Sequence, residues 1–385
     1  MTDLPLPDSD AQEVSGRLHQ RIAARIKDAG GRVSFADYMQ WALYEPALGY
    51  YSGGSTKLGV SGDFVTAPEL GNLFGRALAR GIVPLLEQTD ARILELGAGT
   101  GRLAKTVLSE LDALGIAVET YSILDLSGEL QERQQTLLGK ESRVQWLSAL
   151  PDRFSGVVLA NEVLDAMPVK LTCLKGGTWY ERCVACQDGQ FLFEDCAASS
   201  DFLSQTAESL GRHVDTAGLP DGYLTEIHPY TLGFIRSLSA MMGQGKSAAV
   251  LVDYGFPAHE YYLPERSAGT LMCHYRHQAH DDPFHLPGLQ DITAHVNFTA
   301  VAETAAGSGL DVLCYTSQAG FLMASGIMDL LPSMEGNDTA SILLRQEAMK
   351  LLSPAEMGEL FKVMVLGHDV MPSETLLQAD RSGRL

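Results

Sequence analysis

The chain of 385 residues has little cysteine and no long apolar run. Its six cysteines are too few and too irregularly spaced for a disulfide scaffold, which favours a reducing compartment. No stretch approaches the roughly 18 consecutive apolar residues of a membrane-spanning helix. The first residues, MTDLPLPDSDAQEVSG, lack an apolar signal core and carry several acids, which transit peptides avoid. We therefore expect a bacterial cytoplasmic protein without a membrane span.

Basic residues are also scarce. The chain has 28 Lys and Arg against 48 Asp and Glu, a formal net charge of -20. The phosphate backbone of a nucleic acid repels such a surface, so we expect no nucleic-acid partner. A basic protein segment is a more natural large partner. No apolar stripe stands out as an oligomer interface, so the sequence leaves the oligomeric state open.

The first part of the chain is predicted to be helical. Apolar residues recur every four positions from residue 14 to residue 26, which indicates an amphipathic helix after a frayed start over residues 1–11. Ser34 followed by Asp37 predicts the beginning of a second helix. A third helix is expected to start near Glu69.

From residue 92 the pattern changes to short apolar strands that alternate with helical stretches. Such alternation predicts an α/β fold, a parallel sheet with helices on both faces. One long excursion begins as a β-meander, and a second, residues 256–298, looks loop-like and is rich in His, Asp and Pro. The expected strands of the sheet are residues 92–96, 121–124, 144–147, 157–160, 248–252, 311–316 and 361–366.

The strongest motif is ILELGAGTGRLA, residues 93–104. A strand with an acidic residue, Glu95, runs into Gly97, Gly99 and Gly101 before a helix begins. Glycine lets the backbone approach a ligand closely, and N–H groups at the helix start point toward it. GTGRLA also fits the looser dinucleotide fingerprint. We prefer the GxGxG interpretation, because the glycines start directly after the strand and Glu95 suits a positively charged amino group. A tight turn without a ligand is the plain alternative.

The next strand ends at Asp125, which is 24 residues after Gly101. A carboxylate at the tip of the second strand can accept both ribose hydroxyls of a nucleoside. An aspartate in this place can also cap the following helix, and the two roles can coexist. With the glycine loop, Asp125 indicates an adenosine-type ligand.

The fourth strand, in VVLANEVLDAMP, ends in Asn161, Glu162 and Asp165. The carboxyl edge of a parallel sheet faces the ligand crevice. Carboxylates there could hold a guanidinium by bidentate bonds, and an amide carbonyl could accept N–H. Capping of a following short helix is the alternative. Glu226, in YLTEIHP, is a further candidate acid.

These motifs together resemble the MidA-like, complex I assembly-factor family of S-adenosylmethionine-dependent protein-arginine methyltransferases. The resemblance covers residues 33–367, and six landmarks in order make it specific. The family more often has Glu where this chain has Asp125, which shortens the arm by one methylene and keeps the ribose-binding chemistry. The landmarks are YMQWALYEPALGYY (38–51), GDFVTAPELGNLFG (62–75), ELGAGTG (95–101), NEVLDAMPV (161–169), VDYGF (252–256) and PGLQDITAHVNF (287–298).

The resemblance implies a class I, Rossmann-like methyltransferase fold. This is a seven-stranded sheet with an N-terminal helical segment and large inserted α+β elements. The implied organisation is a helical segment with a cofactor-covering loop (1–88), the first part of the S-adenosylmethionine-binding core (89–169), an inserted β-meander and helical substrate region (170–245), core completion with a His-rich lid at 256–298 (246–370), and a C-terminal tail (371–385).

The resemblance also implies the activity. The substrate would be an arginine-containing segment of a protein, such as a subunit of respiratory complex I, with Glu162 or Asp165 polarising the guanidinium. Residues 62–69 would fold over the cofactor or clamp the N-terminal helices to the sheet. The candidate cofactor-binding residues are Asp63, Phe64, Glu95, Gly97, Ala98, Gly99, Gly101 and Asp125, and the candidate catalytic residues are Asn161, Glu162, Asp165 and Glu226.

Two other functional classes stay open. One is an assembly factor or chaperone that binds S-adenosylmethionine without turnover, and the other is an NAD(P)-dependent oxidoreductase. We expect no metal. Cys183 and Cys186 form one CxxC, whereas zinc ribbons usually have two, and the histidines of residues 274–285 match no HExxH spacing.

Overall fold

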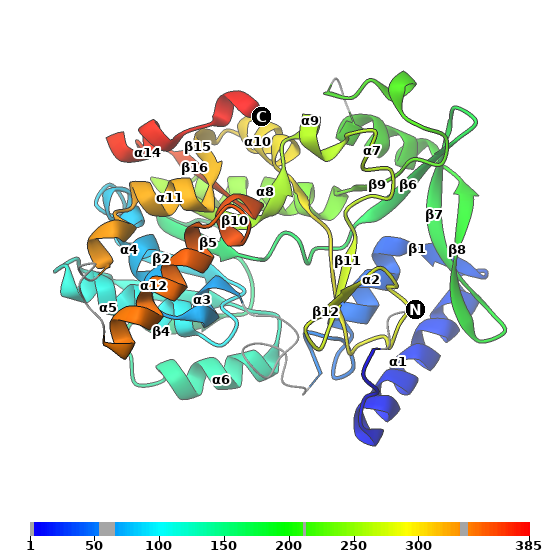
Figure 1. Ribbon diagram of the computed structural model, residues 1–385, viewed down its shortest axis with the longest axis horizontal. Helices are drawn as coiled ribbons and strands as arrows, with labels where there is room; N and C mark the ends of the chain where they lie inside the picture. The colour runs from blue at the N-terminus through cyan, green and yellow to red at the C-terminus, as the bar shows by residue number, and fades with distance from the viewer. Residues whose placement is uncertain (1–3, 54–65, 211–212, 332–337) are drawn as a thin grey trace. The chain divides into compact units, whose positions relative to one another are not determined.

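The computed structural model describes residues 4–53, 66–210, 213–331 and 338–385. These divide into two compact units, each assembled from three stretches of the chain (Figure 1). Within the described ranges no helix is both long and apolar enough to cross a membrane. The first unit takes its residues from Met1–Phe64, Leu164–Gly233 and Phe256–Ala300, and the second from Val65–Val163, Phe234–Gly255 and Val301–Leu385.

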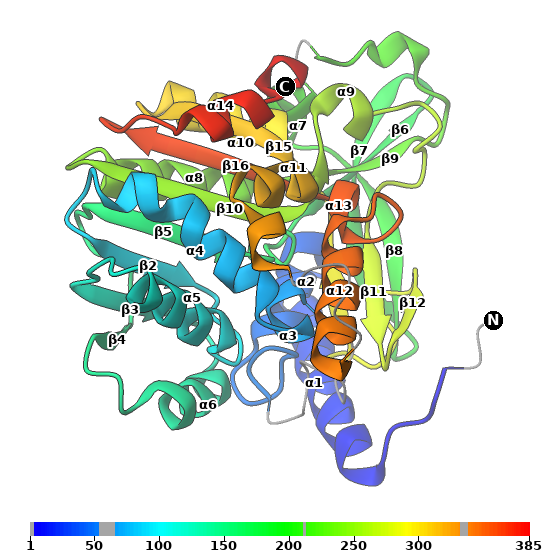
Figure 2. The ribbon, with the colours of Figure 1, turned by 60° about the vertical axis from the view of Figure 1, so that its left-hand side comes forward.

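The second unit contains the predicted sheet (Figure 2). Seven of the eight strands in this sheet follow the order β15-β16-β10-β5-β2-β3-β4, and the two-residue strand β14 pairs with β10. The strands from β10 to β4 are mutually parallel, and β16 runs antiparallel to both β10 and β15. This confirms the expected α/β, seven-stranded fold. The strands are β2 (Arg92–Leu96), β3 (Thr120–Leu124), β4 (Val144–Leu147), β5 (Gly156–Asn161), β10 (Ser247–Phe256), β15 (Asp311–Ser317) and β16 (Phe361–His368).

Strand β10 illustrates why these segments form the centre of the sheet. Its first seven residues are all buried, and β5 and β16 flank it on both sides. Continuous apolar strands are typical of sheets that are covered on both faces. The helices of this unit are α3 (Ala67–Leu70), α4 (Leu73–Leu86), α5 (Arg102–Ala113), α6 (Gly128–Leu138), α11 (Gln318–Ala324), η3 (Ile327–Leu330), α12 (Thr339–Leu352), α13 (Met357–Leu360), α14 (Glu374–Ala379) and η4 (Ser382–Arg384).

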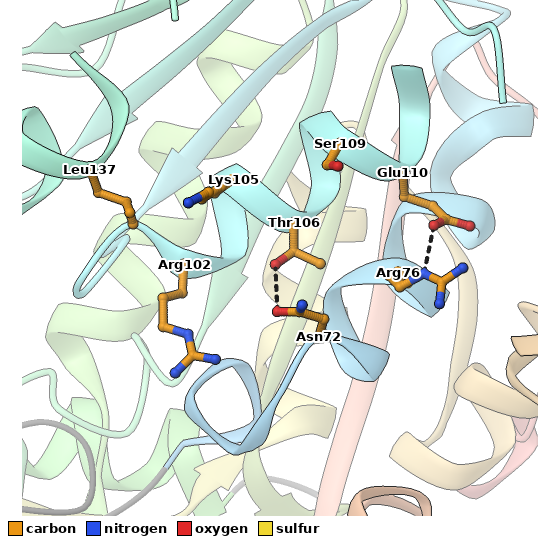
Figure 3. A pocket seen from close by; sticks show the side chains of 8 residues that line it. All are labelled: Asn72, Arg76, Arg102, Lys105, Thr106, Ser109, Glu110 and Leu137. Atoms are coloured by element: carbon orange, nitrogen blue, oxygen red, sulfur yellow. Dashed lines mark hydrogen bonds and ion pairs between the residues drawn. The ribbon is translucent and has the colours of Figure 1, made fainter. Parts of the chain in front are cut away.

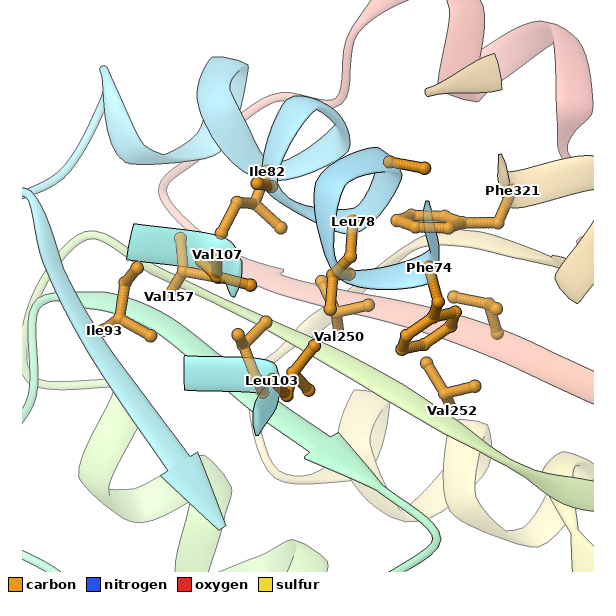
Figure 4. Packing of buried hydrophobic residues seen from close by; sticks show 14 of the residues in the cluster. Phe74, Leu78, Ile82, Ile93, Leu103, Val107, Val157, Val250, Val252 and Phe321 are labelled. Atoms are coloured by element: carbon orange, nitrogen blue, oxygen red, sulfur yellow. The ribbon is translucent and has the colours of Figure 1, made fainter. Parts of the chain in front are cut away.

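Helices α4 and α5 pack side by side over the sheet (Figure 4). Phe74 and Leu78 of α4 and Val107 of α5 are at most 2% exposed, and they pack with Val157 of β5 and Val250 of β10. Each such side chain contributes roughly 1.5–3 kcal/mol by leaving water. This packing fixes α5, and with it the glycine loop that precedes α5.

Buried Glu110 of α5 joins the same two helices electrostatically. Its carboxylate accepts hydrogen bonds from the Nε atoms of Arg76 and Arg80 of α4, each at 2.7 Å. Burial acts to raise the pKa of Glu110, but the two guanidinium groups outweigh it and lower that pKa. Removing this carboxylate would leave both arginines without their partner.

The first unit contains the predicted N-terminal helices and the meander. Strands β1, β7, β6 and β9 form one sheet in that order, with β8 paired to β7. Helices α8 (Pro229–Met242) and α10 (Phe298–Gly307) begin in this unit and end in the other. The remaining elements are α1 (Ser9–Asp28), β1 (Arg32–Ser34), α2 (Phe35–Tyr44), β6 (Lys170–Lys175), β7 (Thr178–Gln187), β8 (Gln190–Ala197), α7 (Ser200–Leu210), η2 (Thr216–Gly218), β9 (Leu224–Ile227), α9 (Ala258–Tyr261), β11 (Met272–Tyr275), β12 (Gln278–His280), β13 (Asp291–Thr293) and β14 (Val296–Asn297).

The N-terminal helices begin where polar side chains cap them. Ser34 accepts a hydrogen bond from the Asp37 N–H, as the capping-box pattern predicts. Helix α1 begins at Ser9 and is capped by Asp8. The prediction of a frayed start over residues 1–11 was therefore too long at its C-terminal end. At the C-terminal end of α2, buried Glu45 accepts hydrogen bonds from Arg21 and Arg25 of α1.

The stretch of residues 256–298 is not loop-like, contrary to expectation. It contains the short helix α9 and a three-stranded sheet in the order β12-β11-β13. These strands have three or four residues each, which is too short for an alternating pattern to be recognised.

One carboxyl group lies inside the main sheet. Glu95 of β2 is 2% exposed, and its Oε2 accepts a hydrogen bond of 2.8 Å from the hydroxyl of Tyr121 on β3. Burial raises the pKa of Glu95 to about 7, and nearby Asp125 adds to the effect. Between about pH 4.5 and pH 7 the folded protein therefore keeps a proton that the unfolded chain has lost, so this group destabilises the fold increasingly as pH rises.

We predict that Glu95→Gln will remove this dependence, because glutamine keeps the size and the acceptor for Tyr121 but does not titrate. The difference in unfolding free energy between variant and wild type should shift in favour of the variant by roughly 2–4 kcal/mol from pH 4.5 to pH 8. Chemical denaturation of both proteins across this range measures it. Parallel pH profiles would show that Glu95 has an ordinary pKa.

Candidate active site

The strand register brings the predicted site residues of the second unit to one edge of the sheet. Leu96 of β2 pairs with Leu124 of β3 on one side and with Ala160 of β5 on the other. The residues that follow, Gly97 and Asp125, therefore emerge beside Asn161, the last residue of β5. The carboxyl edge of parallel strands is where α/β sheets bind their ligands.

The glycine loop joins β2 to α5. Gly97, Gly99 and Gly101 all have positive φ, at 63°, 53° and 86°, a conformation that side chains disfavour. A Cβ at Gly97 would come within 3.0 Å of Val163, so the loop is closely packed on one side. Gly97 itself is exposed while Ala98 is buried. The loop thus presents backbone to solvent at the start of α5.

Asp125 follows β3 and is partly exposed. Its Oδ1 accepts a hydrogen bond from the Ser127 N–H at 2.9 Å, and burial raises its pKa. The side chain that caps α6 is Ser127, which accepts from the Leu130 N–H. Asp125 is therefore not the helix cap, and its carboxylate faces the loop side. The neighbouring Leu126 is 77% exposed and offers an apolar surface beside it.

Two residues that sequence reasoning missed hold the glycine loop. The Thr100 hydroxyl donates to Glu69 Oε1 of α3 at 2.5 Å, and the Arg102 guanidinium lies 3.4 Å from the same carboxylate. Gln134 of α6 donates to the Gly99 carbonyl oxygen at 2.9 Å. Glu69 lies within a family landmark, so a sequence motif could have identified it. Gln134 is one amide within a helix, and no sequence motif marks it.

Glu162 has a strained backbone, with φ of 53°. Strand β10 holds this segment, because the Glu162 N–H donates to the Val252 carbonyl oxygen at 2.9 Å and the Val163 N–H donates to Asp253 Oδ2 at 3.2 Å. Asn161 Nδ2 donates to Glu162 Oε1 at 3.0 Å. The described residues from 163 to 169 form turns and no helix, so the helix-cap alternative for this cluster is wrong.

Asp165 and Glu226 belong to the first unit. Asp165 is 5% exposed. Glu226 is completely buried, and its oxygens accept hydrogen bonds from the Thr270 N–H at 2.7 Å and the Tyr261 hydroxyl at 2.9 Å. So many internal partners favour a structural role for Glu226. Asp63 and Phe64, the expected lid contacts, lie outside the described residues.

A hollow of about 390 Å³ runs along α4 and α5 (Figure 3). Arg102 and Lys105 of α5 line it, and across it the Thr106 hydroxyl lies 3.4 Å from Asn72 Oδ1. None of the predicted site residues lines this hollow. Among the residues that the structure describes, no group of three or more His, Cys, Asp or Glu is arranged to hold a metal ion.

The arrangement at the sheet edge fits an adenosine-type ligand with a charged tail. The glycine loop supplies accessible backbone, the Asp125 carboxylate can accept a pair of hydroxyls, and Leu126 can cover a base. Glu95 lies in β2 just before the loop and is 2% exposed, and burial raises its pKa to about 7.

Comparison with known proteins agrees with this chemistry. Residues 77–316 match the model of a family described as "Putative S-adenosyl-L-methionine-dependent methyltransferase". A crystal structure of a Burkholderia thailandensis protein bound to S-adenosylhomocysteine is 44% identical, covers all of both chains and has a TM-score of 0.91.

Curated relatives are more distant but extend over most of the chain. The mitochondrial protein arginine methyltransferase NDUFAF7 of Danio rerio is 28% identical over 91% of this chain and 87% of its own. That of Homo sapiens is 27% identical over 90% and 82%. The family match decides against the dinucleotide interpretation of GTGRLA. The chain belongs to this family of S-adenosylmethionine-dependent methyltransferases.

Proposed function

We propose that the protein transfers a methyl group from S-adenosylmethionine to an arginine side chain of a protein substrate. The observation that carries the proposal is the carboxylate of Glu162, which β10 holds in a strained conformation at the same sheet edge as the glycine loop. The similarity to protein arginine methyltransferases over nine-tenths of the chain supports it.

The cofactor would occupy the edge formed by β2, β3 and β5. Gly97, Ala98, Gly99 and Gly101 would bind its methionine end through the backbone, and Asp125 would accept the ribose hydroxyls. The Burkholderia relative with bound S-adenosylhomocysteine supports this. S-adenosylmethionine, when bound, supplies an electrophilic methyl group.

The protein's own task would be to position the nucleophile. An arginine is always protonated in water, so its guanidinium nitrogen attacks poorly. As the N–CH3 bond forms and the S–CH3 bond breaks, this nitrogen must release a proton, which a neighbouring carboxylate such as that of Glu162 would accept. Glu162 can accept two parallel N–H bonds from such a group, and Asn161 orients that carboxylate. Fixing the attacking nitrogen in line accounts for much of a methyl-transfer rate. Asp165, three residues further on, is a second candidate for this role.

The proposal is tested by incubating the purified protein and labelled S-adenosylmethionine with a lysate of cells that lack it. Mass spectrometry would then locate the label, and a subunit of respiratory complex I type is the first substrate to examine. Label on an arginine is expected. Label on another residue type would refute the arginine assignment, and cofactor binding without any labelled protein would favour an assembly factor without turnover.

Gly99→Val should abolish cofactor binding, because a β-branched residue is strained at the positive φ of Gly99 and fills space next to the ligand. Gly307→Val is the matched control, since a Cβ at Gly307 meets nothing within 4 Å. Calorimetric titration with S-adenosylmethionine measures both. Wild-type affinity in a folded Gly99→Val protein would refute the placement of the site.

Asp125→Ala should weaken cofactor binding by roughly 1–3 kcal/mol, because two ribose hydroxyls would lose their acceptor. The same titration measures the change, and circular dichroism should show that the variant is folded. An unchanged dissociation constant would remove Asp125 from the cofactor site.

Glu162→Gln should leave the affinity for S-adenosylmethionine within about threefold and lower methyl transfer by a hundredfold or more. Glutamine keeps an acceptor for Asn161 but loses the charge that faces the guanidinium. Affinity, turnover and melting temperature are measured on the same preparation. Preserved turnover would transfer the catalytic assignment to Asp165.

A further inference from the structure

Gln134 is a polar residue that the second unit encloses completely. It lies on α6, and its side chain is 0% exposed. The absence of a side chain at Gly101 lets α6 approach the glycine loop, because a Cβ there would lie 3.4 Å from Gln134 Cγ. Burying a primary amide costs free energy unless its donors and acceptor find partners.

Both the nitrogen and the oxygen of the Gln134 amide form hydrogen bonds. Its Nε2 donates to the Gly99 carbonyl oxygen and to Asp125 Oδ2, each at 2.9 Å. Its Oε1 accepts a hydrogen bond of 3.0 Å from the indole Nε1 of Trp146 on β4. An indole N–H can only donate. Trp146 therefore fixes the orientation of the amide, and both amide hydrogens must point toward the loop and Asp125.

Gln134 thereby connects two separate parts of the site. Gly99 lies in the loop after β2, while Asp125 lies after the neighbouring strand β3. The donors to the Asp125 carboxylate are Gln134 Nε2 and the N–H groups of Ser127, Gly99 and Leu126, and all of them are neutral. They fix the position of the carboxylate without cancelling its charge, which stays available to a ligand.

We propose that Gln134 is a positioning residue for the cofactor. It holds the carboxylate that binds the ribose and the loop that binds the methionine end at a fixed separation, so that both ends of one ligand are bound together. It acts through Asp125 and Gly99 and not by touching the ligand. This inference rests on the cofactor assignment made under the proposed function.

The test is the affinity for S-adenosylhomocysteine, measured calorimetrically at pH 8 and at pH 5.5. Gln134→Glu keeps the size and the acceptor for Trp146 but replaces the donor by a carboxylate that faces Asp125. We expect its affinity to fall at least tenfold relative to wild type at pH 8. At pH 5.5 the gap should narrow, because the introduced carboxyl group takes up a proton and can donate again.

Two further variants make the test specific. Gln135→Glu adds the same charge at the exposed neighbouring position and should stay within twofold of wild type at both pH values. Trp146→Phe leaves the amide in place but removes the N–H that orients it, so affinity should fall about threefold or more. If Gln134→Glu does not fold, the affinity of Trp146→Phe tests the positioning role of Gln134.

The outcomes separate this inference from the proposed function. A wild-type protein that does not bind S-adenosylhomocysteine overturns the cofactor assignment and this inference with it. A wild-type protein that binds, together with unchanged affinity in folded Gln134→Glu or in Trp146→Phe, overturns the role of Gln134 alone. A lower melting temperature with unchanged affinity and no pH effect would likewise show that Gln134 is merely structural.

Discussion

The parallel register between β2 and its two neighbours is the constraint on which the rest of the site depends. Because Leu96 pairs with both Leu124 and Ala160, the segments that follow three different strands begin at the same level. The glycine loop, Asp125 and Asn161 need no long connections to meet. A shift of one strand by a single residue would turn its side chains to the opposite face and move the functional group out of line.

Two carboxylates of the second unit, Glu110 and Asp125, differ in the charge of their partners. Glu110, which joins α4 and α5, is bound by two guanidinium groups that lower its pKa against the effect of burial. Asp125, at the sheet edge, is bound by a side-chain amide and three main-chain N–H groups, and its pKa is raised by burial. A charge that is already neutralised can join helices but attracts no ligand. Because its partners are neutral, Asp125 keeps a negative charge that a ligand can approach. Burying that charge costs free energy, and the surrounding hydrogen bonds reduce this cost.

Most strands of the sheet could be predicted to within one or two residues, because they are short, largely apolar stretches bounded by polar or glycine residues. Strand β10 extends to Phe256, beyond its predicted end at residue 252. The three-stranded sheet within residues 256–298 could not, since its strands are too short for a period to appear. The glycine loop and Asp125 were visible as motifs. The contacts of Glu69 and Gln134 with the glycine loop were not predicted, because they join residues more than thirty positions apart in the sequence. The alternative that Glu162 caps a helix could be rejected only once the turn after β5 was known.

The interleaving of the two units has a consequence for how the chain is made. The chain passes between the units five times, and β5 is synthesised long before its neighbour β10. While residues 164–233 leave the ribosome, β5 has β2 on one side and nothing on the other. Its buried strand residues then form an open apolar edge, the kind that pairs with other chains. Newly made protein is therefore vulnerable to aggregation until β10 arrives, and a pause in translation before residue 247 prolongs that interval.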